Sequence, residues 1–155
     1  MITEDYVSFE TAKLLKEKGF DEPVRMYIKA YIYPPDTAIQ NIKKVTGVDL
    51  EQMEDHFLFN AEDEPFLNSV EGKDKTLFAA PTLQMAMKWL REKHNQNVTV
   101  KAINNVIRLK TVYYAEVQNL LEPGEKGFCV NGCIFKDTYE ESVEYVIKYC
   151  LENLI

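Results

Sequence analysis

Apolar residues recur with helical spacing in three stretches of the chain and alternate with polar residues in most of the segments between them. Helical spacing buries one stripe of a helix, whereas alternation buries one face of a strand. The helical stretches are residues 9–18, 81–95 and 139–154. Short strands and turns separate them. This order favours an α+β fold, in which an antiparallel sheet carries amphipathic helices packed on one face.

The ends of these helices carry suitable capping residues. Ser8 is placed to begin the first helix, and Gly19 can adopt the left-handed conformation that ends it. Pro81 fits the first turn of the second helix. Asp137 or Thr138 can cap the third helix. The boundaries of all three helices are therefore predicted from local chemistry.

Alternation predicts a strand over residues 24–33, which Pro34-Pro35 ends. Residues 66–70 and 76–80 flank a short polar loop and predict a β-hairpin. Further strands are expected over residues 98–103, 106–120 and 128–135.

We expect a single domain over residues 1–155, with a helical insert at about 36–65. Residues 36–47 predict one helix. Asp49 can cap a second, short helix with helically spaced apolar residues. The apolar stripe of this second helix consists of Leu50, Met53 and Phe57.

Acidic charge is concentrated in this insert. The formal net charge of the chain is −7, and residues 49–64 hold seven acids and no Lys or Arg. The rest of the chain is neutral, so the acidic segment indicates an interaction surface. Contact with phosphates requires clustered Lys and Arg, which argues against direct nucleic-acid binding. The acids are Asp49, Glu51, Glu54, Asp55, Glu62, Asp63 and Glu64.

Residues 37–53 have the outline of a helix-turn-helix motif, but the second helix would carry acids where a DNA reader carries bases. A rod of carboxylates can instead imitate phosphates and occupy a nucleic-acid-binding or defence protein of a host. An acidic nucleic-acid mimic is therefore one alternative function.

The strand pattern also predicts an aromatic surface on the outer face of the sheet. Tyrosines that shield their own sheet are the simpler interpretation, and a binding or dimer surface is the other. The residues concerned are Tyr27, Tyr31, Tyr33 and Tyr114.

No motif of a familiar catalytic, cofactor or calcium site occurs in the sequence. We therefore expect no cofactor and no metal, and we leave enzymatic activity open with a preference against it. His94, near Trp89 in the second helix, is the place for a small-ligand or enzymatic site if there is one. His56 lies within the acidic segment.

The sequence has three cysteines, and Cys150 lies in the apolar stripe of the last helix. If Asn131-Gly132 forms a two-residue hairpin turn, Cys129 and Cys133 point to opposite faces of the sheet and can share neither a metal nor a disulfide. A different turn would change this geometry. Reduced thiols, no signal peptide and no apolar run of membrane-spanning length predict a cytoplasmic protein.

The helical segments read YVSFETAKLLKEKGF at residues 6–20, APTLQMAMKWLREKHN at 80–95 and YEESVEYVIKYCLENLI at 139–155. Together they resemble a group of small uncharacterised proteins of gut Bacteroides and their phages and prophages. The resemblance covers the three helices, about a third of the chain. It implies an accessory protein of a phage or other mobile element, and it supplies no activity or catalytic residue.

The sequence thus favours a non-enzymatic accessory protein that acts through protein–protein interaction, either with a partner or as a homo-oligomer. We expect no direct contact with nucleic acid or membrane. The acidic insert and the tyrosine surface are the expected contact sites. The acidic mimic and a small-ligand binder or enzyme at His94 are the alternatives.

Overall fold

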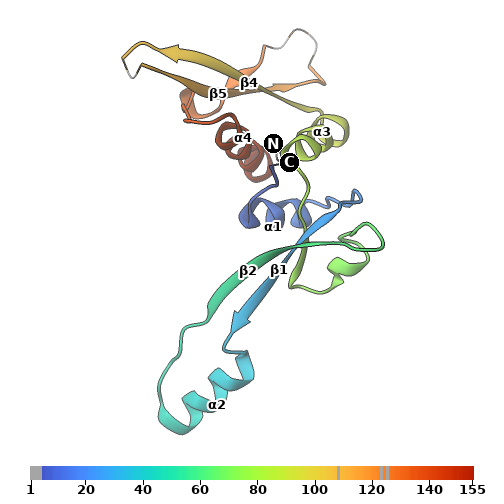
Figure 1. Cartoon of the computed structure of the whole chain (residues 1–155), viewed down its shortest axis with the longest axis vertical. Helices are drawn as coiled ribbons and strands as arrows, with labels where there is room; N and C mark the ends of the chain where they lie inside the picture. The colour runs from blue at the N-terminus through green and yellow to red at the C-terminus, as the bar shows by residue number, and fades with distance from the viewer. Residues whose placement is uncertain (1–4, 108, 123, 125) are drawn as a thin grey trace.

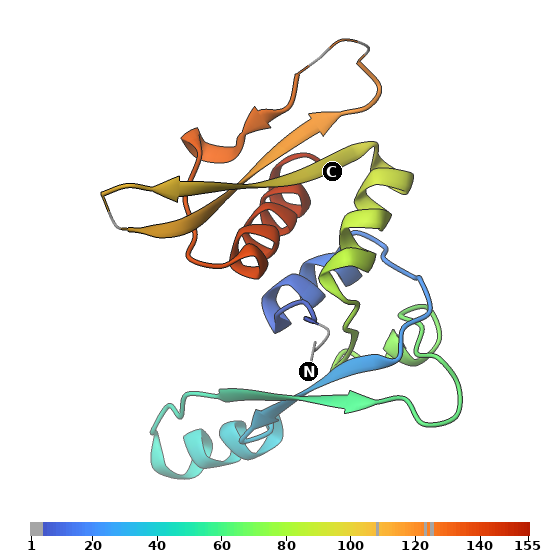
Figure 2. The same ribbon diagram turned by 45° about the horizontal axis from the view of Figure 1, so that its top comes forward.

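The computed structural model describes residues 5–107, 109–122, 124 and 126–155. Three helices, α1 (Phe9–Glu17), α3 (Leu83–His94) and α4 (Tyr139–Asn153), form a central layer. A small antiparallel sheet lies on each side of that layer, as Figure 1 and Figure 2 show. The α+β class is confirmed. The helices pack between two sheets, however, and not on one face of a single sheet.

The upper sheet in Figure 1 has the strand order β4–β5–β6. Its long hairpin confirms the strands expected between residues 98 and 120. Helix α4 packs against β4 and β5, where Val98 and Val117 face each other across the two strands and are buried. The strands are β4 (Gln96–Asn105), β5 (Lys110–Asn119) and β6 (Phe128–Cys129).

The lower sheet has the order β2–β1–β3. Helix α1 covers its inner face through Phe9. The ring of Phe9 stacks on His56 at 4.5 Å and meets Phe78 edge-on at 5.3 Å between ring centroids. This contact joins the sheet to the helical layer. The strands are β1 (Met26–Tyr33), β2 (Met53–Asn60) and β3 (Leu77–Ala79).

The hairpin expected between residues 66–70 and 76–80 is wrong. Phe66 forms a bridge with Val24, and β3 pairs with β1 on the side away from β2. The side chain of Asn68 donates to one backbone carbonyl at 2.8 Å and accepts from another backbone N–H at 3.0 Å, which fixes the connecting segment. Pairing between distant segments therefore prevails over the local turn.

Of the two helices predicted in the insert, the first is present and the second is not. Helix α2 (Asp36–Thr46) forms where expected and ends at Gly47, whose φ of 71° is left-handed. The second helix, expected from Asp49, is wrong because residues 53–60 form β2 and pair with the whole of β1. The middle half of the acidic segment is thus a strand of the sheet, and two of its seven acids, Glu54 and Asp55, lie in that strand.

The cysteine prediction also fails. Residues 130–132 form a short 3₁₀ turn, η2 (Val130–Gly132), so no two-residue hairpin separates Cys129 from Cys133. Their Cα atoms lie 4.8 Å apart, and a disulfide joins their sulfurs. Asn131 and Cys133 have left-handed φ values of 49° and 61°, which fold the chain back on itself. Cys150 is a free, buried thiol, as expected.

A carboxylate connects the first and last helices. Ser8 caps α1, and its N–H donates to Glu144 Oε1 of α4 at 3.1 Å. The hydroxyls of Ser8 and Thr11 donate to the same oxygen, and Thr11 is fully buried. Thr138, and not Asp137, caps α4 through a capping box.

Candidate functional site

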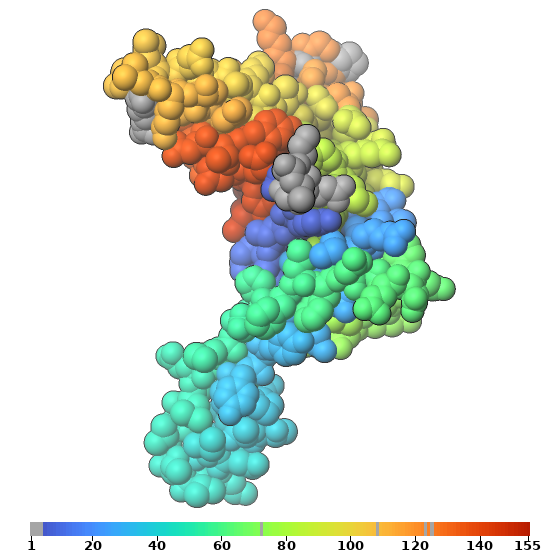
Figure 3. Space-filling view, in the orientation of Figure 1, coloured from blue at the N-terminus to red at the C-terminus, as the bar shows by residue number. Residues whose placement is uncertain are grey.

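The most distinctive part of the molecule projects away from the packed layers. We call residues 31–60 the arm: the end of β1, all of α2 and all of β2. Figure 3 shows it extending from the body as a narrow protrusion, and Figure 1 places α2 at its far end. Every residue of the arm is described, and none is buried. The rest of the described chain we call the body.

The outer face of the arm is aromatic and exposed. Tyr31 and Tyr33 of β1 lie on this face, and the β1–β2 register brings Met53 and Phe57 to the same side. The exposed fractions are 70% for Tyr33, 72% for Met53 and 53% for Phe57. Tyr31 meets Phe57 edge-on at 5.8 Å between ring centroids. Large apolar side chains therefore form a continuous exposed row along the arm.

The predicted surface of four tyrosines is divided between the two sheets. Tyr27 lies at the base of the arm, stacked between Phe59 and Phe66 at 5.6 and 5.1 Å. Tyr114 belongs to β5 in the other sheet and meets Phe135 edge-on at 5.8 Å. Tyr27, Tyr31 and Tyr33 share one face of β1, where Tyr27 is half-buried, so the expectation of one shared surface is wrong only for Tyr114.

The apolar side of helix α2 is only partly covered: Ile39 is half-buried, and no residue of the helix is buried. Val45 is 84% exposed and Ile42 is 37% exposed. Polar contacts hold the helix to the segment that connects it to β2: Gln52 Nε2 donates to Asp36 Oδ1 at 2.7 Å, and Lys43 pairs with Asp49 at 2.7 Å. A helix of 11 residues is marginal in water without packing on its apolar face.

The acidic residues run along the arm and past its base without forming a helical rod. Asp49 and Glu51 lie at the far end, and Glu54 and Asp55 point to opposite faces of β2. Glu54 is 4.0 Å from Lys13 of α1, and Asp55 accepts the His56 N–H at 2.9 Å. The loop after β2 carries the remaining three: Glu62, Asp63 and Glu64.

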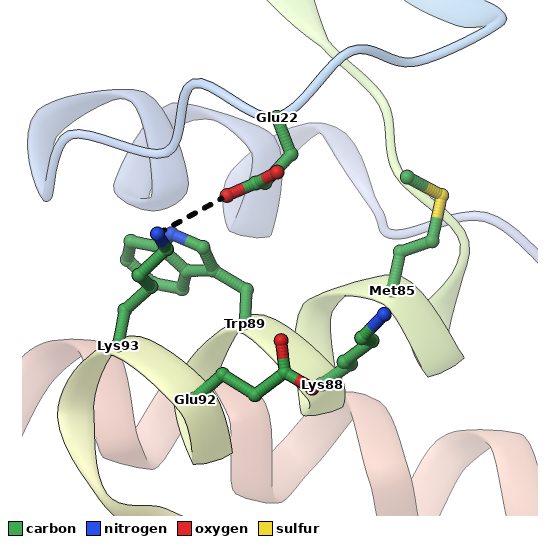
Figure 4. A pocket seen from close by; sticks show the side chains of 6 residues that line it. All are labelled: Glu22, Met85, Lys88, Trp89, Glu92 and Lys93. Atoms are coloured by element: carbon green, nitrogen blue, oxygen red, sulfur yellow. Dashed lines mark ion pairs between the residues drawn. The ribbon is translucent and has the colours of Figure 1, made fainter.

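The hypothetical site near His94 has little room for a ligand. A pocket beside Trp89 holds about 150 Å³, and the Glu22–Lys93 ion pair, at 3.9 Å, lies across it (Figure 4). Ligand pockets usually enclose about 300–1,000 Å³. His94 packs edge-on against Trp89 at 4.3 Å, and its pKa is lowered by burial and secondarily by Lys18. The histidine thus acts as a packing residue at the end of α3.

Two other groups with shifted pKa values have structural roles. Burial lowers the pKa of Lys16, whose ammonium donates to the backbone carbonyls of Asp74 and Leu77 at 3.0 and 2.7 Å. Burial raises the pKa of the Cys150 thiol to about 12, which makes this thiol inert. Neither residue is part of the lining of five pockets on the described part of the chain.

Among the described residues, no three His, Cys, Asp or Glu side chains are grouped so that they could hold a metal ion. No helix in that part of the chain has the length and apolar character needed to cross a bilayer. Comparison with family models, curated proteins and solved structures found no match. The resemblance of the three helical segments to a phage and prophage group therefore stays a prediction.

Proposed function

We propose that the chain is a non-enzymatic protein-binding module that works through its arm. One observation carries this proposal: residues 31–60 expose a row of large apolar side chains and bury none of them. Contiguous apolar surface of this kind marks interaction sites in monomeric proteins. Burial against a partner would remove this apolar surface from water.

The total surface supports the same proposal. The chain exposes 10183 Å². A compact monomer of 18.0 kDa would expose about 8,000 Å². The excess of about 2,000 Å² exceeds the roughly 800 Å² that each partner buries in a standard interface. An arm that docks on another protein would remove part of this excess.

The acidic mimic is less well supported than protein binding by an apolar arm. Mimicry of a nucleic acid requires carboxylates arranged like a row of phosphates. Here Glu54 and Asp55 lie on opposite faces of a strand, and Asp49 is already paired with Lys43. The acids therefore serve better to select a partner than to imitate a duplex.

The biological setting stays a prediction. A role in a phage or other mobile element rests on the resemblance of the helices alone. The cytoplasmic location was inferred in part from three reduced cysteines, and the Cys129–Cys133 disulfide removes that part of the argument. We therefore propose the mode of action and leave the compartment open.

The proposal is tested with two matched variants of the full chain. The first removes three exposed apolar side chains from the arm: Tyr33→Ser, Val45→Ser and Met53→Ser. The control removes three from the tip of the β4–β5 hairpin, which are 85%, 94% and 88% exposed: Val106→Ser, Ile107→Ser and Leu109→Ser.

The readouts are capture from a lysate of the source organism, quantified by mass spectrometry, and sedimentation velocity of the purified chain. We expect a captured protein, or self-association, that is lost with the arm variant and kept with the control. A wild-type chain that is monomeric and captures nothing would contradict the proposal. So would binding that survives the arm substitutions.

A further inference from the structure

We infer that the partner of the arm is a basic, extended segment of another protein, which joins β2 as an additional antiparallel strand. This inference rests on the proposed function of the arm and specifies its ligand. Strand β2 is an edge strand of the sheet, and all eight of its residues are exposed. An exposed edge strand offers unpaired backbone groups to an incoming chain.

The register identifies which backbone groups face outward. Ala61 N–H donates to Arg25 C=O at 2.8 Å, which extends the β1–β2 ladder by one hydrogen-bonded pair. In an antiparallel ladder such pairs alternate, so the odd-numbered residues of β2 turn their backbone groups toward β1. The even-numbered residues turn theirs toward the open edge. These are Glu54, His56, Leu58 and Asn60.

The open edge of β2 has a backbone donor for a carbonyl of an added strand and a carboxylate for a basic side chain. The outward N–H of His56 is bonded to Asp55 Oδ1 at 2.9 Å. A carbonyl of an added strand can take over this N–H, which frees the Asp55 carboxylate to pair with a Lys or Arg of the same strand. The side chains of an added strand that point outward would lie beside Phe57 and Phe59, which are 53% and 36% exposed.

The acidic charge around β2 favours a basic segment as the added strand. The acids lie toward both ends of β2: Glu51, Glu54 and Asp55 at one end, and the loop 62–64 at the other. No Lys or Arg occurs between residues 49 and 64. A segment with apolar residues at its centre and basic residues toward its ends matches this arrangement, and opposite charges across the contact would speed association.

A second copy of the chain fits this edge poorly. In a symmetric antiparallel pairing of two β2 strands, the acidic beginning of one strand would lie beside the acidic loop 62–64 of the other. In a parallel, in-register pairing each acid would lie beside its own counterpart. Like charges directly opposite each other destabilise a strand pair. The edge therefore favours a partner of opposite charge.

The test selects 12-residue peptides from a random display library on the immobilised full chain. We expect the enriched peptides to carry more Lys and Arg than the unselected library. Their affinity is then measured for a three-acid variant (Glu51→Gln, Glu54→Gln and Asp55→Asn) and for a control with the same change of charge on α1 and α4 (Glu17→Gln, Glu140→Gln and Glu152→Gln). We expect about tenfold weaker binding to the first variant and unchanged binding to the control.

Strand addition is tested by N-methylation of alternate residues in an enriched peptide. Only every second residue of an added strand donates to β2, so one methylated series should lose binding and the other should keep it. The inference is overturned if the peptides lack basic residues, if the three-acid variant binds like the control, or if both methylated series behave alike. Peptides that bind the apolar side of α2, and are lost with Val45→Ser, would overturn strand addition and leave the proposed function standing.

Discussion

Helices α4 and α2 are both amphipathic, yet they end in opposite environments. Helix α4 buries six of its 15 residues against α1, α3 and the strands β4 and β5. Helix α2 buries none of its 11 residues. The same kind of sequence pattern is satisfied by contacts in the body and left unsatisfied in the arm. An apolar stripe on a helix therefore predicts that this face is buried, either within the same chain or against a partner protein.

The two regions also differ in what stabilises them. Complete burial of a large apolar side chain contributes about 1.5–3 kcal/mol. A hydrogen bond contributes about 1 kcal/mol net, and less where water competes. The body has a core of buried side chains, whereas the arm depends on the β1–β2 ladder and on side-chain contacts such as that of Gln52. Stability should therefore be concentrated in the body, and the arm should open locally.

Hydrogen exchange gives the largest expected contrast between the two regions. Backbone amides in the middle of α4 should exchange at least about a thousandfold more slowly than those of α2, because α4 opens only when the core opens. The measurement is native-state hydrogen exchange of the full chain, read residue by residue. Equal protection of both helices would show that the arm is packed as firmly as the body.

A core truncation gives the next largest effect. Leu151 of α4 is fully buried, so Leu151→Ala should lower the free energy of unfolding by about 3 kcal/mol. Val45 of α2 is 84% exposed, and Val45→Ala should change it by less than about 0.5 kcal/mol. Urea unfolding of the two variants beside the wild type measures both values. A loss of more than about 1 kcal/mol for Val45→Ala would contradict the exposure of Val45 on α2.

The contact of Glu144 with the start of α1 should be worth less than the core residue but more than any contact in the arm. Glu144→Ala removes the carboxylate that accepts from the Ser8 and buried Thr11 hydroxyls and should cost about 2 kcal/mol. Glu144→Gln keeps an oxygen acceptor and should cost about half as much. Asp36→Ala, which removes one of the two acceptors of Gln52 in the arm, is the matched comparison and should cost less than about 0.5 kcal/mol.

Most of the body was predictable because its local signals agree with its long-range contacts. Ser8 and Thr138 cap the helices that their sequences predict, and the stripe of α4 faces the core. The disulfide was missed because it depends on left-handed backbone at Asn131 and Cys133. The dipeptide Asn131-Gly132 equally suits a hairpin turn. Local chemistry could not decide between the two turns.

The arm was only partly predictable because its second strand is specified by its partner strand. The spacing of Met53 and Phe57 fits a helix, yet the run Phe57-Leu58-Phe59 is rich in residues that favour strands. Pairing with β1 decides the outcome, and nothing in the residues of β2 alone reveals that pairing. The position of the acids is read directly from the sequence, but the placement of Glu54 and Asp55 in an edge strand follows only from the sheet.

The division of the tyrosines had a similar cause. Alternation assigns Tyr31 and Tyr114 to outer strand faces; Tyr31 is exposed, and Tyr114 is half-buried beside Phe135. The pattern does not say how many sheets the strands form, because strands of one sheet and of two sheets alternate alike. Tyr31 therefore belongs to the candidate site, and Tyr114 lies on the far side of the helical layer.

The smallest expected effect is a pH dependence at the edge of the body. Burial against Trp89 and the nearby Lys18 lower the pKa of His94 in the folded chain below its ordinary value of 6.5. Below about pH 6.5 the unfolded chain therefore binds a proton at this position more readily than the folded chain, so His94 lowers stability as the pH falls.

The variant His94→Gln has no titrating group at this position. Its free energy of unfolding relative to that of the wild type should therefore rise when the pH is lowered from 7.5 to 5.5. Urea midpoints of both proteins at the two pH values measure this double difference, from which groups common to both proteins cancel. A difference that is independent of pH, or that falls as the pH is lowered, would show that His94 is not held against the body in solution.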